Sequence, residues 1–250
     1  MANRIKFAMF PAAVLLASSV ASAEMTVTLT QYDVNQMKHK VDLAAKFFQA
    51  TWRDVFTQAG KNYPAPRLVA FQTQVQSGCG LLKSGNAMYC RIDNTVYYDV
   101  VFLTAEMKAT AAARGTDGDY APIVILAHEM GHGIAHILDA RFVLTYSKER
   151  LADCLAGVVT WYAKRAGNLE TGDLEEGLYE LARGGDGPNV SILHPRAHGP
   201  AKARQDAFLL GYNSGISACN AEIGKALAVN APATKTWERP LSFPGMNFRR

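Results

Sequence analysis

Two histidines and a glutamate in the segment HEMGH, from His128 to His132, could together hold and use a metal ion. On a helix, His128 and His132 lie four residues apart on one face, where both imidazoles can reach a single zinc ion. Glu129 lies one step round the helix and can take a proton from a water molecule at the metal. The pattern therefore predicts zinc-assisted hydrolysis, with Glu129 as the general base.

A catalytic zinc ion usually has three protein ligands and one open position for water, so a third ligand is needed. The extended form of the motif is excluded, because Leu138 stands where its third histidine would be. His136 continues the four-residue series but lies one further helical turn from the ion. The third ligand is therefore expected outside this helix.

Glu149 and Asp153 form a second candidate pair, four residues apart on one face of another predicted helix. Glu149 can bind zinc there, while Asp153 can accept the free N–H of a liganding histidine. The alternative is an exposed acidic pair beside Lys148 and Arg150. The upstream motif favours Glu149 as the third zinc ligand and Asp153 as the support of a histidine.

Four cysteines form an even set, which favours two disulfide bonds if the chain enters an oxidising compartment. Three pairings are open. We favour Cys79 with Cys90, which closes a short glycine-rich loop, and Cys154 with Cys219, which ties a predicted helix to the C-terminal region. A four-cysteine zinc site is the rival, but the spacings contain no C-x-x-C and the histidines are better placed ligands.

The elements that must position these residues follow from hydrophobic spacing. Apolar residues at three- and four-residue steps predict a helix over residues 41–59, and stretches rich in Val, Tyr and Phe predict short antiparallel strands over 67–75, 88–93 and 95–103. Further helices are predicted over 121–139, 148–166, 173–182, 201–212 and 217–229. The expected fold is α+β, a small antiparallel sheet followed by a helix-rich portion that carries the HExxH helix.

The composition fits one domain, which we place at residues 24–229 of the 250. The net charge of +4 comes from 26 basic and 22 acidic residues spread along the chain, so no nucleic-acid partner is expected. Residues 230–250 contain prolines and no periodicity, which predicts an irregular C-terminal arm.

The first 23 residues have a basic start, an apolar stretch over 7–16 and the small-residue pattern ASA at 21–23. This arrangement predicts a signal peptide cleaved before Glu24, with export to the periplasm or the extracellular space. The alternative is an uncleaved membrane anchor, but the apolar run is short and Pro11 interrupts it. A cleaved signal leaves no stable membrane span.

Around these motifs the chain resembles the bacterial family of neutral zinc metallopeptidases, in which a cysteine-bearing strand region precedes the metal helix. One departure is Arg91, where we expect a larger residue and a proline; it concerns the rim of a strand and not the ligands. The likeness runs in order through SGCG (77–80), YCRIDNTVYYD (89–99), GDYAPIVILAHEMGH (118–132), ERLADCLAG (149–157), GDLEEGL (172–178), AHGPAKARQDAFLLGY (197–212) and ACN (218–220).

The resemblance implies a gluzincin-like zincin fold, Zn²⁺ as cofactor, a peptide or protein as substrate and an extracytoplasmic location. It also makes His198 the candidate for stabilising the oxyanion, with a surface or capping histidine as the alternative. Tyr97 and Tyr98 could do the same but are more typical of strand packing. We expect the substrate to add as a strand along a sheet edge at residues 94–101.

Two other functions stay open. One is a non-catalytic, zinc-binding exported interaction module, against which the intact ligands and Glu129 argue. The other is a zinc amidase that acts on cell-wall peptides, which would use the same metal chemistry and differ only in substrate.

Overall fold

A long first helix, α1 (Gln31–Gln58), underlies the other elements of the computed structural model, which describes residues 29–219 and 221–228. Thr30 and Asp33 form a capping box, each side chain accepting a hydrogen bond from the backbone N–H of the other. This cap starts the helix at Gln31 rather than at residue 41. The predicted signal peptide (1–23) and C-terminal arm (230–250) lie outside the described residues.

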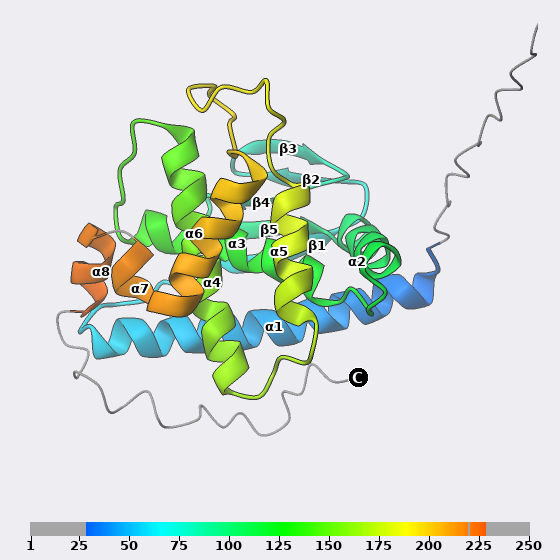
Figure 1. The fold of residues 1–250 in the computed structure, drawn as a ribbon, viewed down its shortest axis with the longest axis horizontal. Helices are drawn as coiled ribbons and strands as arrows, with labels where there is room; N and C mark the ends of the chain where they lie inside the picture. Colours follow the sequence, from blue (N-terminus) through cyan, green and yellow to red (C-terminus); the bar gives the residue numbers. More distant parts are fainter. Residues whose placement is uncertain (1–28, 220, 229–250) are drawn as a thin grey trace, which may run out of the picture.

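The strands and the remaining helices follow along the chain (Figure 1). They are β1 (Arg67–Phe71), β2 (Gln74–Ser77), β3 (Gly80–Lys83), β4 (Ala87–Cys90), β5 (Thr95–Asp99), α2 (Val100–Arg114), α3 (Tyr120–Ile137), α4 (Thr145–Arg165), α5 (Asp173–Arg183), α6 (Ala201–Ser214), α7 (Ile216–Cys219) and α8 (Ala221–Ala228). The predicted final helix over 217–229 corresponds to α7 and α8, and its residues 220 and 229 lie outside the described residues.

The main sheet has the strand order β1-β5-β4. Strand β4 pairs antiparallel with β5, but β1 pairs parallel with β5, so the prediction of a wholly antiparallel sheet was wrong. The chain leaves β1, forms the separate hairpin β2–β3, returns as β4 and then places β5 between β1 and β4. Because β5 is central, the predicted substrate edge at residues 94–101 was also wrong, and β4 is an edge.

The strand predicted over residues 95–103 ends at Asp99, where α2 begins. The Asp99 carboxylate accepts hydrogen bonds from the backbone N–H groups of Val101 and Phe102. This N-cap stabilises a helix in a segment whose valines and phenylalanine favour a strand. Local capping therefore overrides β-propensity there.

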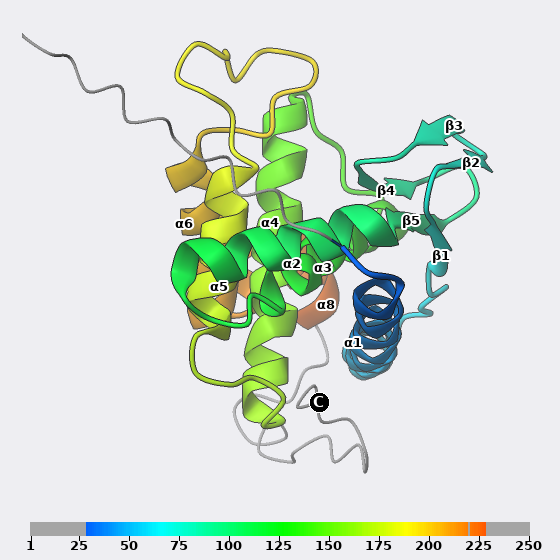
Figure 2. The same ribbon diagram turned by 90° about the vertical axis from the view of Figure 1, so that its right-hand side faces the viewer.

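Helix α3 packs against α4 and α5, and α6 packs against the same two helices, most extensively against α4. Figure 1 shows α4, α5 and α6 running across the direction of α1. Figure 2 shows these helices on one side of the molecule and the strands on the other. Gly157 and Gly211 lie at the α4–α6 contact, where each faces a backbone carbonyl of the other helix. Within the described residues, no helix has the length and apolar character to cross a membrane.

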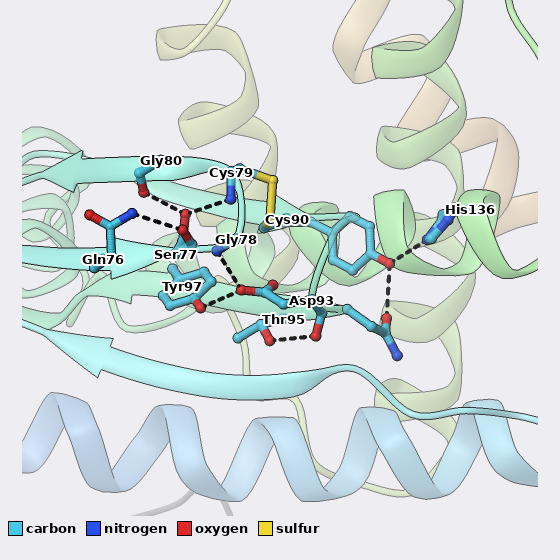
Figure 3. The surroundings of a disulfide bond; sticks show 12 residues. Gln76, Ser77, Gly78, Cys79, Gly80, Cys90, Asp93, Thr95, Tyr97 and His136 are labelled. Atoms are coloured by element: carbon cyan, nitrogen blue, oxygen red, sulfur yellow. Dashed lines mark hydrogen bonds between the residues drawn. A yellow bond between two sulfur atoms is a disulfide. The ribbon is translucent and has the colours of Figure 1, made fainter.

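Both favoured cysteine pairs are bonded in the structure, Cys79 to Cys90 and Cys154 to Cys219. The second bond joins α4 to the end of α7. The first joins the β2–β3 turn to the end of β4, and Figure 3 shows its surroundings. There Asp93 accepts hydrogen bonds from the Gly78 N–H and the Tyr97 hydroxyl, both 2.7 Å, which fixes the turn against the sheet.

Candidate metal centre

The HEMGH segment lies within α3, and its two histidines point toward a carboxylate of α4. His128 and His132 are 5% and 7% exposed. Their Nε2 atoms lie 3.1 and 3.3 Å from the same oxygen, Oε2 of Glu149. The structure thus brings together the three residues that the sequence predicted as ligands.

A glycine in the motif lets α4 approach closely enough for this. A Cβ atom on Gly131 would lie 2.7 Å from the carbonyl oxygen of Ala152, so the two helices pass nearly backbone to backbone at that point. Glu149 and Asp153, one turn apart on α4, therefore both face α3. Their burial, at 6% and 0% exposed, follows from the same contact.

The three donors fit a zinc ion in spacing and in chemistry. Two ligands about 2.0–2.1 Å from a tetrahedral zinc ion lie about 3.3 Å apart, which agrees with the distances from both histidines to Glu149. The ligand atoms of the three residues all lie within 4.8 Å of one another. Two imidazoles and a carboxylate are also a donor set that catalytic zinc uses.

The electrostatics of the site favour a bound cation. Burial lowers the pKa of His128, but the charge of Asp153 and hydrogen bonds to Asp153 and Glu149 outweigh it and raise that pKa to about 10. Burial raises the pKa of Glu149, but hydrogen bonds with His128 and His132 hold it well below its usual range. The site therefore holds positive charge tightly, and a metal ion would replace a proton there.

Asp153 orients His128 and is itself held by Arg204. The Asp153 Oδ1 atom lies 2.7 Å from Nδ1 of His128, which leaves Nε2 directed at Glu149. From α6, Arg204 donates to both oxygens of Asp153 at 2.8 and 2.9 Å and to the Gly184 carbonyl at 3.0 Å. Burial raises the pKa of Asp153, but the charges of His128 and Arg204 lower it by more than burial raises it. The carboxylate therefore stays ionised.

Replacing Arg204 should weaken zinc binding although it touches no ligand donor atom. We expect Arg204→Met to lower zinc affinity about 10–100-fold, because the buried Asp153 loses the group that fixes it against His128. Arg204→Lys should recover only part of this, since an ammonium cannot make the bidentate contact. Competition with a zinc chelator measures the affinities.

Arg150→Met is the matched control, because Arg150 is exposed on α4 next to Glu149 and has no contact with Asp153 among the described residues. It should bind zinc as the native chain does. Equal zinc affinity in Arg204→Met and the native chain would contradict the positioning role of Arg204.

The side chain of Glu129 extends from α3 toward strand β4 and is partly exposed. Its carboxylate accepts a hydrogen bond of 2.7 Å from the backbone N–H of Tyr89. Gly133 allows this approach, because a Cβ there would lie 2.9 Å from Pro66 and 3.3 Å from the Tyr89 ring. The carboxylate is therefore fixed beside the ligands without being one of them.

Two cavities border the ligands, and strand β4 lines both. The first, of about 170 Å³, is lined by Ala87, His128, Glu129, His198 and Arg204 among others. The second, of about 470 Å³, is lined by Tyr89, His132, His136, Thr145 and Lys148 among others. Space for a ligand thus extends on both sides of the histidines, along one strand edge.

The other predicted residues fall in different places. His198 lies in the long loop 184–200 between α5 and α6, is exposed, and lines the same cavity as Glu129. His136 lies outside the ligand group, with Nδ1 2.7 Å from the Tyr89 hydroxyl. Tyr97 and Tyr98 are buried, and the Tyr97 hydroxyl donates a hydrogen bond to Asp93. Packing therefore accounts for the positions of both tyrosines.

Two contributions to the site escaped the sequence analysis. One is the support of Asp153 by Arg204, and the other is the backbone N–H of Tyr89 that holds Glu129. A buried carboxylate requires a partner, but the sequence does not say which arginine supplies it. A backbone donor leaves no signal in the side-chain pattern.

The HExxH motif on α3 and the glutamate that α4 places against it form the candidate metal site of a zincin-like α+β protein. The chain belongs to the family described as "Putative neutral zinc metallopeptidase", whose model matches residues 17–148. The match covers the HExxH motif and ends one residue before Glu149. The α+β fold class and the family resemblance are thereby confirmed.

Relatives in two bacterial groups resemble the chain. "Uncharacterized protein YpfJ" of Escherichia coli K12 is 31% identical over 250 residues, which cover 86% of this chain and 85% of that protein. "Uncharacterized protein Rv2575" of Mycobacterium tuberculosis H37Rv is 28% identical over 196 residues, covering 66% and 64%. No solved structure matches the chain significantly.

Proposed function

We propose that the protein is an exported zinc peptidase whose metal is held by His128, His132 and Glu149. The observation that carries this proposal is the convergence of both Nε2 atoms on one oxygen of Glu149, at distances compatible with tetrahedral zinc. Its supports are the family of the chain and the position of Glu129 beside the ligands. The two disulfide bonds support an oxidising compartment.

In this proposal the chain's own residues do the proton transfer. Zinc, when bound, polarises the substrate carbonyl and lowers the pKa of a water molecule. Glu129 takes the proton of that water and passes it to the leaving amine. Asp153 and Arg204 keep His128 oriented during both steps.

Strand β4 supplies the edge along which an extended peptide would lie. It is an edge of the main sheet, and its residues Ala87 and Tyr89 line the cavities on either side of the ligands. A peptide added to this edge would place a carbonyl near Glu129. His198, in the cavity that Glu129 also lines, is the proposed donor to the oxyanion.

The experiment is zinc-dependent cleavage of a mixed peptide library by the purified full chain. A chelator should remove activity, and one equivalent of zinc should restore it. Glu149→Gln should bind zinc at least about 100-fold more weakly, because a neutral amide replaces the anionic ligand. Asp206→Asn, which changes an exposed carboxylate on α6 paired with Lys202, should behave as the native chain.

Other outcomes would point elsewhere. Zinc binding without cleavage of any peptide would contradict the peptidase proposal and favour a binding module. Cleavage confined to amide bonds of cell-wall peptides would favour an amidase. Undiminished zinc affinity in Glu149→Gln would show that the third ligand is another residue.

A further inference from the structure

A second group of carboxylates meets at the N-terminal end of α3, about 13 Å along the helix from His128. Asp117 and Asp119 precede α3, Glu170 precedes α5, and Asp173 and Glu176 lie in the first turn of α5. Carboxylate oxygens of Asp119, Asp173 and Glu176 lie within 4.8 Å of one another. Those of Asp117, Asp119 and Glu170 do so as well, so Asp119 belongs to both groups.

Helix capping explains part of this group. Glu176 accepts hydrogen bonds from the backbone N–H groups of Gly118 and Tyr120, at 3.1 and 2.9 Å. Oδ2 of Asp173 accepts one from the Glu170 N–H at 2.8 Å. Acidic residues also suit the positive end of α5. Capping therefore accounts for the hydrogen bonds of Glu176 and for one oxygen of Asp173.

Capping does not account for the other oxygen of Asp173. The residue is 4% exposed, and its Oδ1 atom is buried with no hydrogen-bond partner among the described residues. Leaving a buried carboxylate oxygen unsatisfied is costly. Asp173 borders a cavity of about 10 Å³, lined also by Lys40, Asp119, Asn168 and Glu170. That space is close to what a single water molecule or ion needs.

The charges around the cavity are unbalanced. Lys40 contacts the Asp119 carboxylate. Among the described residues, it is the only cationic side chain that lines the cavity. One ammonium thus faces the three carboxylates that line the cavity, those of Asp119, Glu170 and Asp173. The turn that gathers them is also fixed, because Gly118 has φ 72° and a Cβ there would lie 2.2 Å from the Met107 carbonyl oxygen. The group cannot easily spread to relieve its repulsion.

We propose that these residues form a calcium site, with Asp119, Asp173 and Glu176 as its protein ligands and Asp117 and Glu170 at its outer side. The donors are all oxygen, which selects a hard cation over zinc. Calcium binds oxygen at about 2.3–2.6 Å, so two of its ligands lie up to about 5 Å apart. The carboxylate oxygens lie within 4.8 Å of one another, which is compatible with this geometry.

Calcium at this place would join three segments of the chain. They are the turn before α3, the loop that follows α4 and the start of α5. Since α3 and α4 carry the proposed zinc ligands, the ion would brace the frame of the metal centre from its far end. This inference does not depend on peptidase activity.

The test is calcium binding by the zinc-loaded full chain. Titration calorimetry measures the binding, and thermal unfolding in CaCl₂ measures its effect on stability. We expect one calcium ion per chain and a rise in Tm of about 5–10 °C at a concentration about 100 times Kd. Asp173→Asn should abolish both effects. Glu175→Gln, an exposed carboxylate in the same helical turn but outside both groups, should retain them.

Stability without calcium, zinc content and the Lys40→Met variant test the same site in other ways. Without calcium, Asp173→Asn should unfold at the native temperature or above it, because it removes a buried, unpaired charge; its zinc content should also be unchanged. Lys40→Met should bind calcium several-fold more tightly, since it removes a competing cation. No heat and no Tm shift in the native chain, or a shift that persists in Asp173→Asn, would overturn the calcium site and leave Lys40 as the counter-ion.

Discussion

Replacing Glu129 by glutamine should leave about one zinc ion per chain and lower kcat/KM about 10²–10⁴-fold. Glutamine has the same shape, and its carbonyl oxygen can still accept the hydrogen bond that the Tyr89 N–H gives to Glu129. It cannot take a proton from water. The metal ligands are untouched, so binding and turnover should separate in this one variant.

Zinc content by mass spectrometry and peptide cleavage by the same sample measure this effect. Glu175→Gln serves as the control, because its carboxylate is exposed on α5 and outside the metal centre. Cleavage within about tenfold of the native rate would contradict the role of Glu129 as general base. Loss of zinc together with activity would show that Glu129 helps to build the site.

Replacing Gly157 by alanine should have the largest effect on stability. A Cβ atom at Gly157 would lie 1.9 Å from the carbonyl oxygen of Phe208 and 2.9 Å from the nitrogen of Tyr212. These are backbone atoms, so no side-chain rotation relieves the contact, and α4 must move away from α6. We expect a loss of about 3 kcal/mol or more, which lowers Tm by about 6–12 °C.

The displacement of α4 should also weaken zinc binding, because Glu149 and Asp153 lie on the same helix. Thermal unfolding with intact disulfide bonds measures the first effect and chelator competition the second. Gly187→Ala is the control, since an added Cβ there meets no atom within 4 Å. A Tm of Gly157→Ala within about 2 °C of that control would contradict the close α4–α6 contact.

The sequence predicted the parts of the site that depend on spacing within one helix. His128 and His132 share a face of α3, and Glu149 and Asp153 share a face of α4, because both pairs are four residues apart. Arg204 could not be assigned to Asp153, since the contact joins α6 to α4 and depends on how the helices pack. Periodicity describes one element at a time.

The incorrect predictions about the fold have the same origin. The parallel pairing of β1 with β5, and hence the central position of β5, depends on the path of the chain and not on the composition of a strand. The helix α2 was taken as strand because its first residues are β-branched or aromatic, while the signal that decides it is the single N-cap Asp99. The meeting of Asp173 and Glu176 with Asp119 is also tertiary, so no spacing in the sequence indicates it.

X-ray absorption at the zinc edge, on the full chain loaded with one equivalent of zinc, tests the central claim most directly. The ligand set of His128, His132 and Glu149 predicts two imidazole nitrogens at about 2.0–2.1 Å, with oxygen atoms completing the shell, and a spectrum that changes in Glu149→Gln. A zinc–sulfur distance near 2.3 Å, a third imidazole, or a spectrum unaltered in Glu149→Gln would contradict this assignment.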